Sequence, residues 1–486
     1  MRSSRIGEGT LAEAWKVAKF GGSCVSDAEM YDRIAKAVQT DPSRKFVVVS
    51  AIAGVTDSLV STLAKPREEK EIDLFIAELR RLHVGLLPRS PGSPSASVET
   101  IDALVTKLER LLYGVAYTEE ITARTRDFIL SFGERLAAQV VAANLLGHRI
   151  DARAHEADVV GIVTDDNYGN ANALLDETRA RLAPFLKRQA HAGHVSVITG
   201  FFGLSREGKT ATFGRGGSDY SAAVVAYALK LPAIEIWKDV GGFMSADPKI
   251  VPEAFPLAAL SYGEAAELSY LGAKVLHPRS VRPAEMCGAS IILKNIYEPD
   301  EVGTRIGPDT VDRSGDVKSI SYVRDLTTLK VFGTGAGPKE SLLSQVATAL
   351  ADAGINVYSA ATSQTCIAFL IDADAVFGAK KVLTRLPAGF VERLEVLPHA
   401  SLISFVGEGI GYAHGVAARV FRAVAERGIN VQLISAGASM VAYTFTVDSK
   451  DLEGAVQAVH REFFGPRRSR PEVAEVAAAP RSVPSG

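Results

Sequence analysis

The segment KFVVVSAIAG at residues 45–54 places the strongest constraint on the fold. It is a continuous apolar run that ends in a glycine turn. A strand that is apolar on both sides must be covered on both faces, which is typical of the middle of a parallel sheet. The strand WKVAKF precedes it, and the helical pattern DAEMYDRIAKAV between them has its apolar residues on one face. These segments predict a fold in which strands and helices alternate.

This alternation continues from residue 16 to about residue 300. Long amphipathic helical patterns over 66–130 form an insertion, and RSPGSPSAS at 89–97 predicts a loop within it. Repeated βα units favour a doubly wound α/β domain with a mostly parallel sheet, so we predict one such domain over 16–300. Its other strands are expected in GHRIDARAHEADVVGIVT, VSVITGFFG and AIEIWKDV, and its later helices over 217–230 and 261–274.

The chain changes character after about residue 316, where an internal repeat begins. Residues 352–357 are DAGINV and residues 426–431 are ERGINV, and each segment follows an amphipathic helix and leads into a further strand. The repeat predicts two copies of one small α+β module, over 316–396 and 397–465. The first copy is expected to have the order βαββαβ, whereas the second is short of its last strand.

The strand VKSISYV at 317–323 has no place in either copy of the repeat. It could supply the strand that the second copy lacks. We therefore expect the two modules to share strands.

The balance of charges argues against two classes of partner. The 486 residues contain 54 Lys and Arg against 56 Asp and Glu, a net charge of −2, which gives no electrostatic reason to expect nucleic acid or a membrane surface. No apolar run approaches the roughly 18 residues of a membrane-spanning helix. Three widely spaced cysteines, Cys24, Cys287 and Cys366, suit a reducing compartment, so we expect a cytoplasmic protein. Disorder is expected over 1–15 and 466–486.

The segment VAKFGGSCVSD at 17–27 raises the first question of chemistry. Lys19 lies in a short apolar run that breaks at Gly21 and Gly22 and then offers Ser23. The lysine and the glycines could form a cradle for a phosphate. A Gly-Gly turn followed by a capping residue is also ordinary strand-to-helix geometry. Taken alone, the segment favours the tight turn.

A second dense motif, GRGGSD at 214–219, stands directly before a predicted helix. Its glycines let the backbone approach a ligand closely, and the helix N-terminus offers free N–H groups to an anion. Arg215 supplies a planar fork suited to a carboxylate or a phosphate, and Asp219 could hold an ammonium group or a metal. The alternative is that Ser218 and Asp219 only cap the helix, but a cap does not need an arginine between glycines.

Three further motifs are weaker. SFGERLAA places Glu134 in a helical run, where a surface glutamate pairing with Arg135 is the alternative. WKDVGGFMSADPK places Lys238 and Asp239 in a loop at the end of a buried strand, where α/β sheets bind ligands. GAKVLHP puts Lys274 at a helix end, where a lysine could simply complement the helix dipole.

Taken in order, these motifs resemble those of the aspartokinases, which have the amino-acid kinase fold. The resemblance is carried by KFGGS, SAIAGVTD, SFGERL, GRGGSD, WKDV…DPK and LSYGEAAELSYLGAKVLHP. The two GINV modules resemble the paired ACT domains that follow aspartokinase catalytic domains. The resemblance extends over nearly the whole chain, from Val17 to Phe464.

The resemblance implies an activity and its partners. Aspartokinases use ATP and Mg²⁺ to phosphorylate the β-carboxylate of L-aspartate, which gives L-4-aspartyl phosphate, the first step of lysine, threonine and methionine biosynthesis. It also implies feedback by lysine or threonine at the ACT domains, and a homodimer or a tetramer. The rival interpretation is a catalytically silent amino-acid sensor. Loss of Lys19, Arg215 or Asp219 would mark such a protein, and all three are present.

The resemblance also implies a role for each site residue, and no side chain that ligates a metal by itself. Lys19 would contact the transferring phosphoryl group, and Asp219 would lie near the reacting atoms. The residues implied to bind aspartate are Thr56, Glu134, Arg215 and Ser218. The residues implied to bind the nucleotide are Gly21, Gly22, Ser23, Lys238, Asp239, Met244, Lys249 and Lys274.

The sequence departs from the family pattern at several positions. The usual KFGGTS is KFGGSC here, so Ser23 replaces a threonine and Cys24, a weaker hydrogen-bond donor, replaces a serine. The turn after Asp239 is DVGG, and Met244 stands where the family often has an aromatic residue or leucine. Relatives inhibited by lysine often carry Asp at the position of Tyr358. Lysine feedback could therefore be weakened, moved or replaced by another effector.

Overall fold

The structure is a computed structural model. It describes residues 15–64, 68–88, 94–273, 275–301, 303–308, 316–333, 340–386 and 390–465. Lys274, and the disorder expected up to residue 14 and beyond residue 465, lie outside the described residues.

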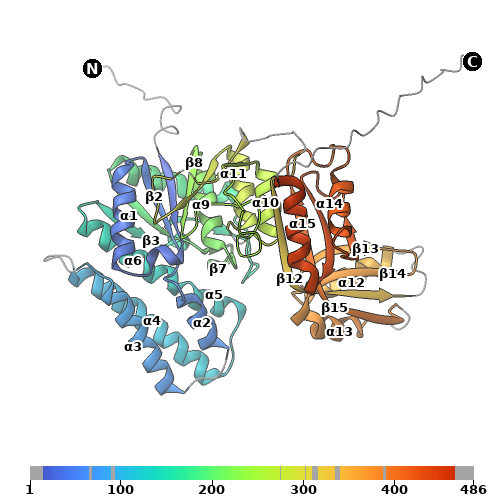
Figure 1. Ribbon diagram of the computed structural model, residues 1–486. Helices are drawn as coiled ribbons and strands as arrows, with labels where there is room; N and C mark the ends of the chain where they lie inside the picture. Colours follow the sequence, from blue (N-terminus) through green and yellow to red (C-terminus); the bar gives the residue numbers. More distant parts are fainter. Residues whose placement is uncertain are drawn as a thin grey trace, which may run out of the picture.

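The N-terminal α/β domain is built on an eight-stranded sheet in the order β3-β5-β2-β1-β8-β10-β11-β9 (Figure 1). The strands from β3 to β10 in this order run parallel, and β11 is antiparallel to β10. A separate sheet has the order β4-β6-β7. The doubly wound fold is confirmed. The strands of this domain are β1 (Lys16–Phe20), β2 (Arg44–Val49), β3 (Ala152–His155), β4 (Val163–Thr164), β5 (Val195–Thr199), β6 (Phe202–Ser205), β7 (Thr210–Thr212), β8 (Ala233–Lys238), β9 (Ala259–Leu260), β10 (Ser290–Asn295) and β11 (Arg305–Ile306).

Helices cover both faces of the large sheet (Figure 1). The helix expected over 217–230 is α9, and the helix expected over 261–274 ends earlier, at Tyr270, because Gly272 then turns the chain at φ +110°. The helices are α1 (Ala28–Thr40), α2 (Val55–Leu63), α3 (Glu69–Gly85), α4 (Pro94–Thr118), α5 (Ala123–Leu130), α6 (Phe132–Gly147), α7 (Ala157–Val160), α8 (Leu175–His191), α9 (Gly217–Leu229), α10 (Tyr262–Tyr270) and α11 (Val281–Cys287), with short 3₁₀ turns η1 (Gly22–Val25) and η2 (Pro278–Ser280).

The insertion forms a hairpin of α3 and α4 that projects from the sheet (Figure 1). The loop expected over 89–97 is wrong at its end, because α4 already begins at Pro94. A proline is tolerated in the first turn of a helix, where its missing N–H would have no intrahelical partner. The proline therefore starts this helix.

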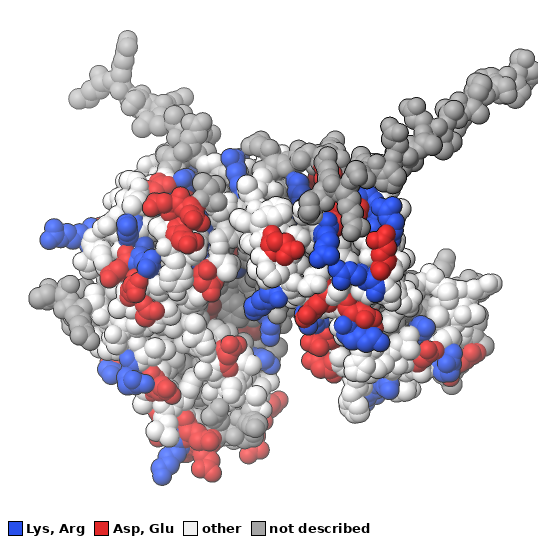
Figure 2. Space-filling view, in the orientation of Figure 1, with Lys and Arg blue, Asp and Glu red and all other residues white. Residues whose placement is uncertain are grey.

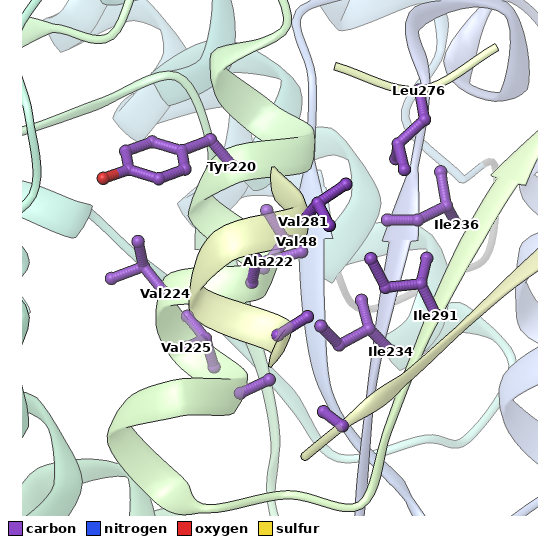
Figure 3. Packing of buried hydrophobic residues seen from close by; sticks show 14 of the residues in the cluster. Val48, Tyr220, Ala222, Val224, Val225, Ile234, Ile236, Leu276, Val281 and Ile291 are labelled. Atoms are coloured by element: carbon purple, nitrogen blue, oxygen red, sulfur yellow. The ribbon is translucent and has the colours of Figure 1, made fainter. Parts of the chain in front are cut away.

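The core of the α/β domain lies between α9 and the central strands, and it explains the apolar run of β2. One large buried cluster (Figure 3) includes these residues, each at most 1% exposed: Val48, Ala222, Val224, Val225, Ile234, Ile236 and Ile291. Burying one valine or isoleucine side chain stabilises a fold by about 1.5–3 kcal/mol. Val48 faces this cluster, whereas Val47 and Val49 belong to a second buried cluster, so the continuous apolar pattern is explained by cover on both faces of the sheet.

One helical segment, Ala123–Gly147, is long and apolar enough to cross a membrane by length and composition. The apolar runs of the sequence did not indicate such a segment. Its most apolar 18-residue window is 89% buried inside the protein, as is usual for a core helix. Length and composition are therefore weak evidence for a membrane span here.

The C-terminal region is one six-stranded sheet in the order β13-β14-β12-β15-β17-β16. Its two long central strands each run through both repeats. The first half of β12, Ser319–Val323, pairs with Leu402–Val406 of the second repeat, and its second half pairs with β14 and with Arg393–Ala400 of β15. The elements are β12 (Ser319–Phe332), α12 (Glu340–Asp352), β13 (Val357–Thr362), β14 (Cys366–Asp372), η4 (Ala373–Ala375), α13 (Val376–Leu383), β15 (Arg393–Val406), α14 (Val416–Ala425), β16 (Leu433–Ser435), β17 (Ala442–Asp448), η5 (Ser449–Asp451) and α15 (Leu452–Phe464).

The two regions pack against each other through α10, which lies beside β12 and α15 (Figure 1). Glu264 of α10 is fully buried, forms an ion pair with Lys318 at 3.0 Å and accepts a hydrogen bond from the Glu408 amide at 2.7 Å. Tyr322 of β12 donates to Asp247 at 2.6 Å. These contacts hold the repeat region against the segment that follows β8.

Candidate active site

The candidate site lies where the carboxyl ends of the central parallel strands meet. Lys19 is the penultimate residue of β1 and Lys238 is the last residue of the adjacent β8. The chain leaves β1 toward β2 on one side, and β8 lies on the other side, so the strand order reverses at this point. In open α/β sheets, ligands bind in the crevice that such a reversal creates.

Three charged side chains form the centre of the site. Asp219 Oδ1 lies 2.6 Å from Lys19 Nζ, and Asp219 Oδ2 lies 3.2 Å from Lys238 Nζ. Lys19 is 5% exposed and Asp219 3% exposed. Burial alone would raise the pKa of Asp219, but the two lysines outweigh it and lower the pKa to about 2. Lys238 Nζ also donates to the Val275 carbonyl at 2.6 Å.

The cluster has one more positive charge than negative. Two ammonium groups surround one carboxylate, which makes the site attractive to an anion such as a phosphate. On the face shown in Figure 2, positive and negative side chains are interspersed without a large area of one sign. No broad charged surface on that face therefore accompanies the excess charge of the buried cluster.

The GRGGSD turn places Asp219 in the first turn of α9. Gly216 has φ +68°, and a Cβ atom there would lie 2.4 Å from the His277 ring, so only glycine fits. The helix cap is Gly216, without a capping side chain. The alternative in which Ser218 and Asp219 serve as caps is therefore wrong. The turn directs Asp219 at the two lysines.

The turn after β1 departs from one expectation. The Gly21 amide donates to the Trp237 carbonyl at 3.1 Å, so it is not free to bind a phosphate. A Cβ atom at Gly21 would lie 3.5 Å from Lys19 Nζ, and one at Gly22 would lie 3.0 Å from the Ala51 carbonyl. The two glycines therefore leave space beside the lysine. Half-buried Ser23 follows them.

Cys24 lies beneath this turn and is fully buried. Its thiol donates to the Trp237 carbonyl at 3.4 Å, and burial raises its pKa. The thiol is therefore held against the protein interior as a packing group.

Glu134 is buried at 3% exposure on α6 and does not pair with Arg135, so the surface alternative is wrong. Its Oε1 accepts from the Ala51 amide at 3.1 Å, whereas its Oε2 is buried without a partner among the described residues. Burial raises the pKa of Glu134 to about 8, although the Ala51 amide and Lys19 favour the charged form. An ammonium group would satisfy this carboxylate.

Other residues expected to bind aspartate also have unused polar groups. Within the described part of the chain, no hydrogen bond or ion pair engages the side chains of Thr56, Arg215 or Ser218. A Cβ atom at Gly133 would lie 3.7 Å from Thr56 Oγ1, which places Thr56 beside Glu134. Ser218 and Arg215 belong to the turn that carries Asp219. The charged cluster thus lies near several polar side-chain groups that have no partner among the described residues.

The residues expected to bind the nucleotide are only partly brought together. Asp239 is exposed next to Lys238. Met244 is half-buried, and its carbonyl accepts from Ser319 of β12 at 2.8 Å. Lys249 is exposed, and among the described residues no contact joins it to the Lys19–Asp219 cluster. Met244 and Lys249 lie in the segment that meets the repeat region.

One arginine that contacts this site has no signal in the sequence and was not predicted. Arg279 follows the LHP motif and donates to Asn170 Oδ1 at 2.8 Å and to the Phe213 carbonyl at 2.9 Å, directly before the GRGGSD turn. A lone arginine after a His-Pro pair belongs to no periodic or spacing pattern. Only the three-dimensional arrangement identifies it.

Comparisons with known proteins identify the relatives of this chain. A model of the amino acid kinase family matches residues 14–295, and a model of the ACT domain matches residues 403–463. Aspartokinase 1, chloroplastic, of Arabidopsis thaliana is 33% identical over 465 residues, which cover 92% of this chain and 80% of that protein. Aspartokinase 3, chloroplastic, of the same plant is 34% identical over 462 residues, which cover 92% and 81%.

Solved structures show the same relationship. E. coli aspartokinase III in complex with aspartate and ADP, in its R-state, has a TM-score of 0.80 and 28% sequence identity, and the match covers 93% of this chain and 100% of that chain. The same protein in complex with lysine and aspartate, in its T-state, has a TM-score of 0.77, also at 28% identity and the same coverage.

Proposed function

The chain belongs to the aspartokinase family and is an aspartate kinase, and we propose that the cluster around Lys19 and Asp219 is its active site. The reaction transfers the γ-phosphoryl group of ATP to the β-carboxylate of L-aspartate and gives L-4-aspartyl phosphate. The assignment rests on a buried, positively charged cluster that lies beside polar groups without partners among the described residues. Glu134 interacts electrostatically with Lys19, and Arg215 and Ser218 share the turn of Asp219. The cluster suits phosphates, and the polar groups suit the ends of an amino acid.

In the proposed mechanism the substrate itself is the nucleophile. An oxygen of the aspartate β-carboxylate forms a bond to the γ-phosphorus while the bond to the leaving ADP oxygen breaks, and no proton needs to move. The two substrates are both anionic, so the protein must align them and stabilise their charge. Lys19 and Lys238 would supply that positive charge, and Asp219 would hold both ammonium groups in place.

Recognition of aspartate is assigned to the polar groups without partners. Arg215 would bind the α-carboxylate, a task for which its planar fork is suited. Glu134 would bind the α-ammonium group, and Thr56 would hold the β-carboxylate beside Lys19. Ser218 would line the same space. Nucleotide roles for Gly22, Ser23 and Asp239 rest on their position around the lysines, and roles for Met244 and Lys249 rest on the family pattern alone.

A magnesium ion would be held mainly by the nucleotide phosphates. Within the described residues, no group of three or more His, Cys, Asp and Glu side chains could hold a metal ion. Mg²⁺ usually keeps several waters and takes one or two carboxylates together with substrate phosphates. The exposed carboxylate of Asp239 beside Lys238 fits that mode. When bound with the nucleotide, the ion would neutralise phosphate charge.

The activity is tested by trapping the acyl phosphate. We expect ATP- and Mg²⁺-dependent formation of a hydroxamate when the protein is incubated with L-aspartate and hydroxylamine. Glutamate and N-acetylglutamate serve as matched controls and should give no product. Turnover of either control without turnover of aspartate would contradict the substrate assignment, and binding of lysine or threonine without any turnover would favour the sensor instead.

The raised pKa of Glu134 predicts that aspartate binding depends on pH. With a pKa of about 8, the carboxyl group is mostly protonated at pH 7 in the absence of substrate. Binding of an ammonium group favours the carboxylate, so each aspartate that binds displaces a proton. The KM for aspartate should therefore fall as the pH rises from 6.5 to 8, by up to about ten-fold per pH unit. Steady-state kinetics over this range measure it.

Glu134→Gln is the matched control for this prediction. It should raise the KM for aspartate and remove its pH dependence. The raised pKa also means that the stability contributed by protonated Glu134 is present below its unfolded pKa and is lost as the pH rises through about 8. The melting temperature of the variant relative to the wild type should therefore rise between pH 5 and pH 8. A KM that does not vary with pH in the wild type would contradict the role.

The repeat region is proposed to bind a feedback amino acid. The ACT domain match over 403–463 and the lysine complex of E. coli aspartokinase III support regulation by an amino acid. Tyr358 lacks a carboxylate but donates to Asp372 at 3.1 Å, so a carboxylate lies beside it on β14. Inhibition assays with lysine, threonine and methionine, singly and in pairs, identify the effector. No inhibition by any of them would contradict the proposal.

We also propose that the protein is a homodimer, and light scattering measures the assembly.

A further inference from the structure

We propose that Arg279 is a positioning residue that fixes the turn carrying Arg215 and thereby sets the affinity for aspartate. The inference rests on the proposed function of Arg215. The Arg215 side chain is exposed and has no partner in the described part of the protein. Its position before aspartate binds therefore depends on the backbone of its turn. Whatever holds that backbone also places the guanidinium group.

Arg279 connects this turn to a neighbouring loop. Its Nη1 donates to the Phe213 carbonyl at 2.9 Å and to Asn170 Oδ1 at 2.8 Å. Its Nη2 donates to Asn172 Oδ1 at 2.7 Å and to the Ala171 carbonyl. One guanidinium group thus makes four charge-assisted hydrogen bonds, which are the stronger kind in proteins. Phe213 lies two residues before Arg215, so the bond to its carbonyl fixes the start of the turn.

The same arginine also contacts the end of the turn. Its guanidinium carbon lies 4.9 Å from the centre of the Tyr220 ring, and Tyr220 directly follows Asp219 in α9. The Tyr220 hydroxyl accepts from the Ala173 amide at 3.2 Å, which ties the helix to the same loop. Arg279 therefore holds the chain on both sides of Arg215.

A third contact runs through the backbone. The Arg279 amide donates to His277 Nδ1 at 3.3 Å, and the His277 ring fills the space that a Cβ atom at Gly216 would occupy. The Pro278–Ser280 turn thus supports the glycine next to Arg215 while the Arg279 side chain supports Phe213. By contrast, Lys19 and Lys238 are held by Asp219 and by the strands, without contact to Arg279.

These contacts predict different effects on the KM values of the two substrates. Loosening the turn should misplace Arg215, and a small misplacement of a substrate-binding group can cost up to about 100-fold. Arg279→Ala should therefore raise the KM for aspartate roughly 10- to 100-fold, while the KM for ATP stays within about two-fold. Arg279→Lys keeps one charge but cannot reach four acceptors. Its KM for aspartate should therefore lie between the values of the wild type and of Arg279→Ala.

The experiment measures both KM values, kcat and the melting temperature of the full chain. Arg282→Ala is the matched control, because Arg282 is exposed on α11 and, among the described residues, forms its ion pair with Glu285. Its kinetics should equal those of the wild type. An unchanged KM for aspartate in Arg279→Ala, or an equal rise of both KM values, would overturn the inference. If Arg279→Ala did not fold, Arg279→Lys and Asn170→Ala would carry the same test.

Arg215→Ala separates this inference from the function on which it rests. If Arg215→Ala left the KM for aspartate unchanged, the proposed role of Arg215 would be wrong, and the inference with it. If Arg215→Ala raised that KM and Arg279→Ala did not, only the inference would be wrong.

Discussion

Replacement of Lys19 with alanine should lower kcat by roughly 100- to 1,000-fold, which is the usual cost of removing one charge-stabilising donor from an active site. Lys19 is nearly fully buried, and its ammonium group lies 2.6 Å from Asp219 at the carboxyl end of β1. Charge that develops on the phosphoryl group would lose its nearest buried cation. The KM values for ATP and aspartate should change less than kcat, because Lys238 and Arg215 remain.

Stability must be separated from chemistry in this variant. Breaking a buried ion pair usually costs about 3–5 kcal/mol because it leaves a charge without a partner. Here Asp219 retains Lys238 at 3.2 Å, so the loss should be smaller. Thermal melting and ADP binding of Lys19→Ala should remain close to those of the wild type. Lys16→Ala, in the same strand but paired with Asp41 at 2.8 Å and with Glu235 at 3.8 Å, is the matched control. A kcat near the wild-type value would show that Lys19 has no catalytic role.

The fold of the N-terminal domain could be predicted because its signals are local. The run FVVV of β2 is fully buried, and an apolar run of this length that ends in a glycine turn strongly favours a covered parallel strand. The glycines next to Lys19 and Arg215 likewise mark turns that the backbone requires. The ends of elements were less predictable. α10 ends at Tyr270 because Gly272 packs against the Tyr322 carbonyl, and that contact comes from the distant strand β12.

The repeat was predictable for a similar reason, because each GINV segment follows its own helix. The sharing of strands between the repeats depends on pairing over long distances in the chain. Ser319–Val323 pairs with Leu402–Val406, far along the chain in the second repeat, which no local pattern specifies. Strand sharing was nevertheless expected, because the second copy has one strand fewer than the first.

The candidate site was predictable where function and local geometry coincide. Glu134 illustrates the limit, since SFGERL indicated its importance but not its burial or its raised pKa. Those properties arise from α6 packing against the turn after β2. Arg279 illustrates the opposite case. Its four acceptors come from two segments more than 60 residues earlier in the chain, so only the fold brings them together.

Arg215 is expected to determine the affinity for aspartate. A buried or bidentate charged contact of this kind contributes a few kcal/mol, so Arg215→Ala should raise the KM for aspartate by roughly 100-fold. Arg215→Lys keeps the charge but loses the planar fork, and it should still raise the KM by about ten-fold. The KM for ATP should not change. Arg206→Ala, an exposed arginine paired with Glu177, is the control.

A substrate analogue turns this prediction into a test of the contact itself. β-Alanine has the reacting carboxylate and the ammonium group of aspartate but no α-carboxylate. If Arg215 binds the α-carboxylate, the wild type should use β-alanine with a kcat/KM lowered by about the same factor that Arg215→Ala loses with aspartate. The variant should then discriminate little between the two substrates, because the contact is already absent. An equal loss of kcat/KM for both substrates in Arg215→Ala would instead mean that Arg215 acts elsewhere, on the nucleotide or on the structure of its turn.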